Sequence, residues 1–342
     1  MANSRKTMSE LARLAKVNVS TVSRALNDSP LVKPETKAEI LRIAQEIGYS
    51  VNVAARNLRR QSSETIALVI PIKPGSGETI SDPFFLEMVG AVSMAASRRG
   101  YDLLLSTPED ETAIAERRLL QTGRADGLII IGQAGREDRL QAISEMENRI
   151  VVWGGLQKEA PYTLIGSDNI GGAEMATEHL LGLGRRRILF IGDTSLPEIA
   201  LRYEGYQKAH AEERVEVDPR LSLQIGFGFQ VKEVFPKLTS LIKSGLSFDG
   251  IFGASDALSI AAMDALRQNG LDVPNDVSVV GYDDINQASM SQPSLTTVSQ
   301  NIAEGGELLV SSLIDKLEGK AAASKLTQTN LIIRQSCGAN SA

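Results

Sequence analysis

The sequence predicts an all-α helix-turn-helix headpiece followed by an α/β core of two doubly wound lobes. The first sixty residues show only helical periodicity, whereas from residue 65 short apolar segments alternate with amphipathic ones. The 342 residues are more than one ordinary domain holds. Residues 1–60 carry 11 Lys and Arg against 5 Asp and Glu, a net +6, so the remainder carries −12 to give the chain's −6. Such a basic segment is typical of a nucleic-acid-binding arm, with an ordinary solvated surface as the alternative.

Three short helices are expected in the headpiece. Thr7 and Glu10 have the spacing of a capping box at the start of the first helix. Asn18 is a plausible N-cap for a second helix, which follows after only a few residues. Pro34 suits the first turn of a third helix that ends near Gly48. Apolar residues recur at helical spacing in each: Leu11, Leu14 and Ala15; Val22, Ala25 and Leu26; Ile40, Ile43, Ala44 and Ile47.

The second helix, in the stretch NVSTVSRALN, presents small polar side chains and one arginine. A short helix of this kind after a tight turn matches a helix-turn-helix whose second helix enters the major groove. Arg24 can reach guanine O6 and N7, while Val19 and Ser20 can meet a base edge or a thymine methyl. The alternative is a three-helix cap with a solvated face. The predicted DNA-binding residues of the headpiece are Thr7, Asn18, Val19, Ser20, Thr21, Arg24 and Asn27.

The region from residue 65 to 342 is predicted to form two similar α/β lobes. Strand and helix alternation indicates parallel sheets covered on both faces, and eight apolar strand segments are too many for one small lobe. A ligand is expected where the carboxyl ends of the strands converge. The predicted divisions are 1–50 for the headpiece, 51–64 for a hinge and linker, and 65–342 for the core. The eight expected strands lie in IALVIP, YDLLLS, GLIIIG, IVVWGG, RILFIGD, LSLQIGF, DGIFGAS and VSVVGYD.

Composition excludes several classes of protein. No apolar run reaches the roughly 18–20 residues of a membrane span, and the charged N-terminus lacks the pattern of a secretory signal, so we expect a cytoplasmic protein. Cys337 is the single cysteine, and His179 and His210 are the two histidines. This inventory predicts no disulfide, no metal site and no cofactor. Neither GFGF nor PGSGET completes a phosphate-binding motif, which argues against an enzyme.

The segment TMSELARLAKVNVSTVSRALNDSPLVKPETKAEILRIAQEIGY resembles the DNA-binding headpiece of the LacI/GalR family of bacterial transcription regulators. The likeness continues through SDNIGGAEMATEHLLGLGRRRILFIG, RYEGY, ASDALSIAAMDAL and VPNDVSVVGYDD to LIIRQS, so it spans essentially the whole chain. The resemblance implies a homodimer on a near-palindromic operator. It also implies a core similar to periplasmic sugar-binding proteins, with a small effector in the cleft. No leucine-zipper tail follows LIIRQS, so we expect a dimer.

Residues 52–60, NVAARNLRR, are similar to the hinge helix of the family. The resemblance implies that this segment orders on DNA and that Leu58 inserts into the minor groove. Val51 stands where the family usually has proline, which we expect to loosen the start of this helix. The alternative for Leu58 is a surface leucine packed on the core. The predicted DNA contacts of this segment are Asn52, Ala55 and Leu58.

The resemblance also implies an effector site. Arg202 and Asp283 match the family's ligand-binding arginine and aspartate, and Phe84 and Phe85 match cleft-lining positions, with surface, capping or core roles as alternatives. Gly155 stands where many sugar-responsive members have aspartate, a gap that could admit a bulkier ligand stacked on Trp153. Ser255 replaces a usual asparagine. The predicted effector-binding residues are Phe84, Phe85, Trp153, Arg202, Phe227, Ser255, Asp256 and Asp283.

The sequence therefore predicts a dimeric DNA-binding transcription regulator, a repressor in preference to an activator, that responds to a small molecule. A mono- or oligosaccharide is the expected effector. The alternatives are a regulator that uses a purine or another metabolite as corepressor, and a transport solute-binding protein. The last would need export, and residues 1–60 would have no role in it.

Overall fold

The computed structural model describes residues 6–26, 29–49, 62–71, 80–108, 114–133, 137–156, 160–225 and 230–339. The chain divides into two compact units, Met1–Ser63 and Glu64–Ala342. Asn27, Asn52, Ala55, Leu58 and Phe227 lie outside the described residues, so their predicted roles stay predictions.

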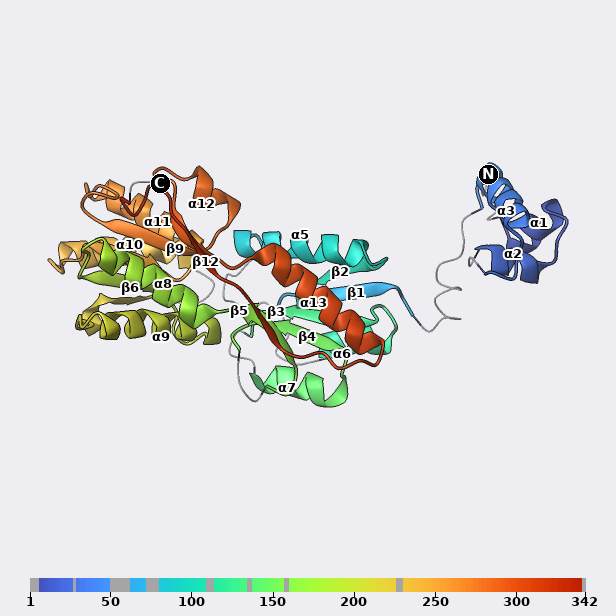
Figure 1. The fold of residues 1–342 in the computed structure, drawn as a ribbon, viewed down its shortest axis with the longest axis horizontal. Helices are drawn as coiled ribbons and strands as arrows, with labels where there is room; N and C mark the ends of the chain where they lie inside the picture. The colour runs from blue at the N-terminus through green and yellow to red at the C-terminus, as the bar shows by residue number, and fades with distance from the viewer. Residues whose placement is uncertain are drawn as a thin grey trace. The chain divides into compact units, whose positions relative to one another are not determined.

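The first unit contains the helices α1 (Met8–Leu14), α2 (Val19–Leu26) and α3 (Pro34–Glu46), seen in Figure 1. The Oγ1 atom of Thr7 accepts a hydrogen bond from the backbone N–H of Glu10 at 3.2 Å and so caps α1. Lys16 has φ +53°, the left-handed conformation that makes the connection to α2 tight. One apolar core joins the three helices, built mainly from Leu11, Ala12, Val22, Ala25, Ile40, Ile43 and Ala44.

The second unit contains two six-stranded sheets, one in each lobe. The N-terminal sheet has the order β11-β5-β4-β3-β1-β2, and the C-terminal sheet has the order β12-β10-β9-β8-β6-β7. The neighbouring strands are parallel, except that β12 runs antiparallel to β10. The strands are β1 (Thr65–Val69), β2 (Asp102–Ser106), β3 (Gly127–Ile131), β4 (Ile150–Trp153), β5 (Thr163–Ser167), β6 (Ile188–Gly192), β7 (Ser222–Gln224), β8 (Gly250–Gly253), β9 (Ser278–Asp283), β10 (Thr296–Ser299), β11 (Lys325–Thr327) and β12 (Asn330–Ile332).

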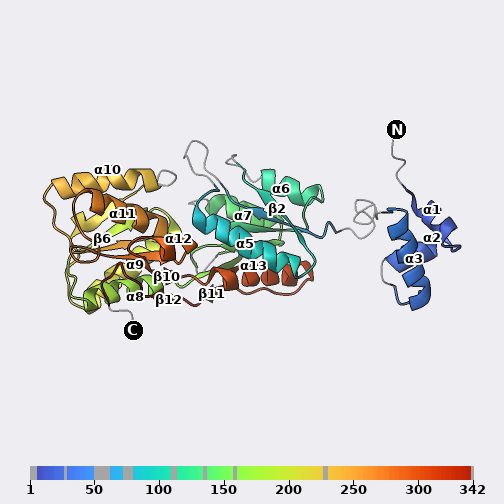
Figure 2. The ribbon, with the colours of Figure 1, turned by 90° about the horizontal axis from the view of Figure 1, so that it is seen from above.

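Helices cover both faces of each sheet, as Figures 1 and 2 show. Buried residues of α5 and α13 share an apolar cluster with one face of the N-terminal sheet, and residues of α6 and α7 share one with the other face. In the C-terminal lobe α10 and α11 cover one face, while α8 and α9 cover the other. These helices are α5 (Pro83–Ser97), α6 (Ile114–Gln121), α7 (Glu137–Met146), α8 (Asn169–Gly182), α9 (Pro197–Glu212), α10 (Gln230–Lys243), α11 (Asp256–Gln268), α12 (Asn286–Met290) and α13 (Ile302–Leu317).

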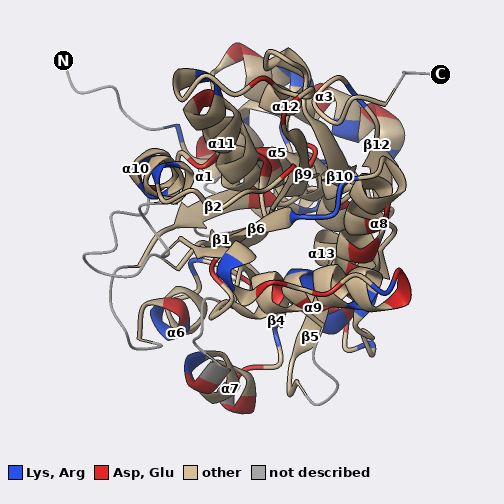
Figure 3. Ribbon diagram, turned by 90° about the vertical axis from the view of Figure 1, so that its left-hand side faces the viewer, with Lys and Arg blue, Asp and Glu red and all other residues tan. Residues whose placement is uncertain are grey.

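The two-lobed architecture agrees with the predicted fold class, and the eight expected segments all contain strands. The sequence analysis missed β5, β10, β11 and β12. Charged residues lie mainly on helices and loops, and the strands are nearly free of them (Figure 3). Within the described parts of the chain, no helix is both long and apolar enough to span a membrane.

The chain crosses between the lobes three times. The crossovers run from β5 to α8, from β10 to α13 and from β11 to β12. The polar residues at these crossovers therefore lie beside the carboxyl ends of the strands of both sheets, where a ligand of an α/β protein is expected.

Candidate nucleic-acid interface and interlobe site

Helix α2 buries one side and exposes the other. Val22 and Ala25 are buried, with relative exposures of 0% and 1%, and fix α2 against α1 and α3. Its exposed side carries three of the predicted base-contacting residues, Val19, Ser20 and Arg24. Of the other predicted contacts, Asn18 and Thr7 are exposed and Thr21 is half-buried. The headpiece thus presents an arginine and small side chains on one helix, which is the arrangement that major-groove recognition requires.

Arg202, on α9, is the centre of a buried polar cluster in the C-terminal lobe. It is 6% exposed, and its Nε donates to Oδ1 of Asn169 at 2.8 Å. Its guanidinium lies 3.8 Å from the ring centroid of Tyr282, and one terminal nitrogen lies 3.6 Å from Oδ1 of Asp283. That nitrogen also donates to the carbonyl of Ala254. The structure therefore brings Arg202 and Asp283 together, and their role as effector contacts stays a prediction.

Asp283, at the end of β9, is held in an unusual state. It is 5% exposed, and its φ of +126° is strained for a residue with a side chain. Its pKa is raised to about 7, mainly by burial and partly by the nearby charge of Asp82, while Arg202 and the hydrogen bond from Gln300 act in the opposite direction. Strain and a perturbed carboxyl together are typical of a functional site.

Asp283 is expected to make stability depend on pH. Its pKa in the folded protein, about 7, lies above the 3.8 of an ordinary aspartate, so the folded state binds the proton more tightly. Its stabilising contribution is complete below pH 3.8 and disappears as the pH rises through 7. The thermal midpoint should therefore decrease as the pH is raised from 5 to 8, and it should decrease less steeply in Asp283→Asn. Scanning calorimetry can measure both slopes. An unchanged slope in the variant would contradict this role.

Phe84 and Phe85 begin helix α5, where Asp82 caps the backbone by accepting from the N–H of Phe84 at 3.0 Å. Both rings are half-buried, and their centroids are 5.8 Å apart. Phe84 packs against the apolar cores of both lobes, so it lies where they meet. The two rings offer the aromatic surface expected at this position.

Three other predicted effector contacts have structural partners. Trp153 is 4% exposed, packs in the N-terminal core, and lies so close to α13 that a Cβ at Gly305 would come within 2.5 Å of the indole. Asp256 is fully buried and accepts from Ile285 N–H at 2.9 Å and from the hydroxyl of Thr297. Ser255 caps α11 through Leu258 N–H. The contacts of these side chains are with other residues of the lobes and stabilise the fold. Their role as effector contacts stays a prediction.

The structure corrects the interpretation of Gly155 as a gap for a bulkier ligand. A Cβ at Gly155 would lie 2.9 Å from Cδ1 of Leu201 and 3.5 Å from Cα of Glu198. Both residues belong to α9 of the opposite lobe. The space that a side chain at position 155 would occupy is therefore filled by protein, because residues of α9 pack directly against Gly155.

Several polar residues of the interlobe region were not predicted. Gln300 and Ser167 are buried at two of the crossovers and are hydrogen bonded to each other at 2.6 Å. Gln133 is also buried, and its side-chain Oε1 accepts from the backbone N–H of Gly155 at 2.9 Å. The backbone nitrogen of Gln133 lies 3.4 Å from a carboxylate oxygen of Glu198. Each of the three ends or follows a buried strand. A polar residue at such a position is a candidate for a functional site, but this pattern alone does not show which candidates meet in the folded chain.

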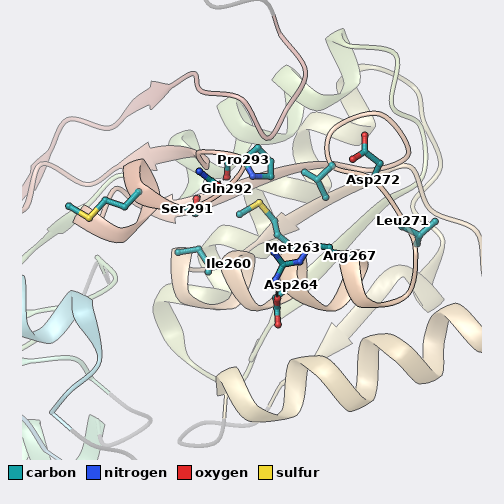
Figure 4. Close-up of a pocket in the computed structure, with 11 residues that line it drawn as sticks. Ile260, Met263, Asp264, Arg267, Leu271, Asp272, Ser291, Gln292 and Pro293 are labelled. Atoms are coloured by element: carbon teal, nitrogen blue, oxygen red, sulfur yellow. Dashed lines mark hydrogen bonds and ion pairs between the residues drawn. The ribbon is translucent and has the colours of Figure 1, made fainter.

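A pocket of about 360 Å³ lies elsewhere, on the C-terminal lobe (Figure 4). None of the predicted effector contacts that the structure describes lies in its lining. Met290, which is 77% exposed, is one of the residues that line it. The pocket is lined by Ile260, Met263, Asp264, Arg267, Leu271, Asp272, Val273, Met290, Ser291, Gln292 and Pro293.

Potential metal ligands are sparse. In the described part of the chain, the group of three that could hold an ion is Glu174, Glu178 and Glu212, carboxylates on the outer surfaces of α8 and α9. Lys208 already pairs with Glu174 at 2.7 Å. This cluster is explained as a solvated surface.

Comparison with known proteins identifies both parts of the chain. Residues 7–52 match the family of bacterial regulatory proteins of the lacI type, and residues 177–337 match the periplasmic binding protein-like domain. The transcriptional regulator RegA of Clostridium saccharobutylicum is 32% identical over 319 residues, covering 91% of this chain and 92% of its own. The regulator CelR of Thermobifida fusca is 32% identical over 342 residues, covering 97% and 98%.

Two solved structures extend this comparison. A complex of the regulator CelR with cellobiose has a TM-score of 0.71 at 29% identity, covering 97% of this chain and 100% of the other. A lac repressor dimer bound to operator and an anti-inducer has a TM-score of 0.85 at 24% identity, covering 98% and 99%. The first is a relative in sequence and fold, and the second supports the fold.

Proposed function

The chain belongs to the LacI family of bacterial DNA-binding transcription regulators, which are not enzymes, and from that premise we propose that it represses transcription as an operator-bound dimer released by a sugar. The observation that carries the proposal is the exposed side of α2, where Arg24 stands among small side chains on a basic headpiece. Arg24, Val19, Ser20 and Thr21 would face the bases. Such a protein acts where bacterial DNA lies, in the cytoplasm.

The remaining predicted contacts would position the headpiece. Thr7, Asn18 and Asn27 are suited to phosphate contacts at helix ends, which fix register without reading sequence. Asn52, Ala55 and Leu58 would act at the operator centre, where a leucine wedge opens a base step. The acidic core would keep affinity for nonspecific DNA low, because it repels phosphates.

Replacing Arg24 tests base recognition. Arg24→Ala should weaken binding to the operator by about 10-fold or more, since one bidentate base contact contributes roughly 1–3 kcal/mol. Arg42→Ala is the matched control, because Arg42 is an exposed headpiece arginine on α3 already paired with Glu39 and Glu46. Fluorescence anisotropy of a labelled fragment from upstream of the protein's own gene measures both. Equal losses in the two variants would show that only net charge matters.

The interlobe chemistry supports a neutral, hydroxyl-rich effector. Arg202 and Asp283 offer a donor fork and an acceptor, and Phe84 and Phe85 offer apolar faces that suit a sugar ring. Asp82 and Asp283 influence each other electrostatically, so an anionic ligand would meet two acids beside one arginine. The relative solved with cellobiose supports a disaccharide in particular. A panel of mono- and disaccharides with nucleobases, added to the operator complex, tests this and includes the purine alternative.

Six of the core's exposed apolar residues support a homodimer, whereas others, such as Leu183, lie elsewhere on the core. The six lie on elements that adjoin one another along one side of the core, from α10 through α11 and α12 to α5 and the edge strand β2 (Figures 1 and 2). The pocket of Figure 4 lies in the middle of this series. A surface of this kind fits a second copy of the chain, since exposed apolar patches mark association sites. These residues are Leu86, Met94, Leu105, Val231, Phe235 and Met290.

The effector would act by changing the angle between the lobes. A ligand that prefers one lobe arrangement shifts the population toward it, and its differential affinity limits the free energy available. In a dimer, this change would move the two hinge segments and so the spacing of the two headpieces. The recognition helices would then lose the spacing of their half-sites.

A further inference from the structure

One glutamine contacts all three crossovers. Gln300 itself belongs to the crossover from β10 to α13. Its Oε1 accepts from the hydroxyl of Ser167, in the crossover from β5 to α8, at 2.6 Å. Its backbone carbonyl accepts a hydrogen bond from the hydroxyl of Thr327 at 2.7 Å, and Thr327 is the last residue of β11, just before the crossover to β12. The three residues are 1–2% exposed, so these bonds are protected from exchange with water.

The same glutamine reaches the candidate effector site. Its Nε2 donates at 2.6 Å to Oδ1 of Asp283, the oxygen that lies 3.6 Å from Arg202. Nε2 faces Asp283, and Oε1 faces Ser167 and accepts from its hydroxyl. A ligand hydroxyl that approaches Asp283 therefore competes with Gln300 for one oxygen.

We propose that Ser167, Gln300 and Thr327 form a hinge relay that converts occupation of the Arg202–Asp283 site into a change of angle between the lobes. The relay rests on the effector response proposed above and adds the residues that transmit it. When a ligand takes the Asp283 oxygen, the Gln300 amide is free to turn. Ser167 then loses its acceptor, and the first two crossovers are no longer tied to each other.

Thr327 and Ser167 are positioning residues in this relay. In the structure the Thr327 hydroxyl donates to the carbonyl of Gln300 and, at 3.4 Å, to that of Gly166, rather than to the groups of the Arg202–Asp283 site. Changing it therefore alters the relay without altering the groups that would bind ligand. Thr327→Val removes the hydroxyl at nearly constant volume, and Thr327→Ser keeps it. The pair separates the hydrogen bond from packing.

The test measures the lobe arrangement of the full chain by energy transfer. Dyes on cysteines that replace Arg124 and Lys243, both exposed and one in each lobe, report the distance between lobes, and the buried Cys337 stays in place. Without ligand, Thr327→Val should shift or broaden the distribution of transfer efficiencies, and Thr327→Ser should match the parent. Identical distributions in all three, with only a lower thermal midpoint in Thr327→Val, would overturn the relay. Ser167→Ala serves as a second variant if Thr327→Val does not fold.

A second arm uses cellobiose as the probe. If the parent responds, Thr327→Val should keep its cellobiose affinity within about 3-fold while the cellobiose-induced change in operator affinity shrinks at least 10-fold. An undiminished change would contradict the relay even with cellobiose bound. A parent that binds operator but ignores cellobiose would contradict the proposed disaccharide, and the ligand-free comparison of Thr327→Val with Thr327→Ser would still decide the relay.

Discussion

Arg202→Gln is expected to abolish the effector response while operator binding stays within about 3-fold of the parent. Arg202 supplies the donors at the centre of the buried polar cluster in the C-terminal lobe, and glutamine can replace only part of the fork. A ligand that bonds to Arg202 in one lobe arrangement and not in the other loses its preference when the fork is removed. We expect sugar affinity to fall by about 100-fold, a loss of roughly 2.7 kcal/mol.

This variant also tests the buried pair. Removing Arg202 leaves Asp283 without its positive neighbour, which typically costs about 3 kcal/mol or more. The pKa of Asp283 is already about 7, so the carboxyl can take a proton and reduce the loss near neutral pH. The destabilisation should therefore grow as the pH rises from 6 to 8.

Arg220→Gln is the matched control for Arg202→Gln. Arg220 lies in the same lobe, is 72% exposed and pairs with Asp218 at 2.7 Å. Surface pairs of this kind contribute little, so stability and sugar response should both be retained. Titration calorimetry with the sugar that releases the parent from operator, together with thermal melts, measures the outcome. A full response in Arg202→Gln would remove this arginine from the site.

The sequence predicted what local patterns determine. Thr7 and Glu10 fix the start of α1, Pro34 the start of α3, and the alternation of apolar segments fixes the two lobes. It missed β11 and β12, two strands of three residues, although it predicted β7, which has the same length. It also missed β5 and β10, which carry Thr, Gly and Ser among their apolar residues.

The site was predicted only in part, for a different reason. The resemblance to a family predicted Arg202, Asp283 and the Phe84–Phe85 pair as effector contacts. The structure places Arg202 beside Asp283 in the C-terminal lobe and packs Phe84 against the cores of both lobes. The role of Gln300 depends on three segments that meet only after both lobes have formed. The space at Gly155 is likewise set by Leu201 of the other lobe. Such long-range contacts have no signature in a local stretch of sequence.

Met290→Asp is expected to cause the largest loss of operator affinity, at least about 100-fold, by breaking the dimer. Met290 is 77% exposed and is one of the residues that line the pocket on the C-terminal lobe, together with Ile260 and Met263. A second copy that covers this surface would bury the methionine, and an aspartate there would be buried without a partner, which is strongly unfavourable. A monomer engages one half-site and loses the contribution of the second headpiece.

Leu183→Asp provides the control for Met290→Asp. Leu183 is also an exposed apolar residue of the C-terminal lobe, 38% exposed at the end of α8, on the face opposite α10 and α11. Sedimentation of the full chain should give a dimer for the parent and Leu183→Asp, and a monomer for Met290→Asp. If Met290→Asp stays dimeric and binds operator normally, the association surface lies elsewhere. If it becomes monomeric and still binds with parental affinity, two linked headpieces are not required, and the proposed spacing mechanism fails with them.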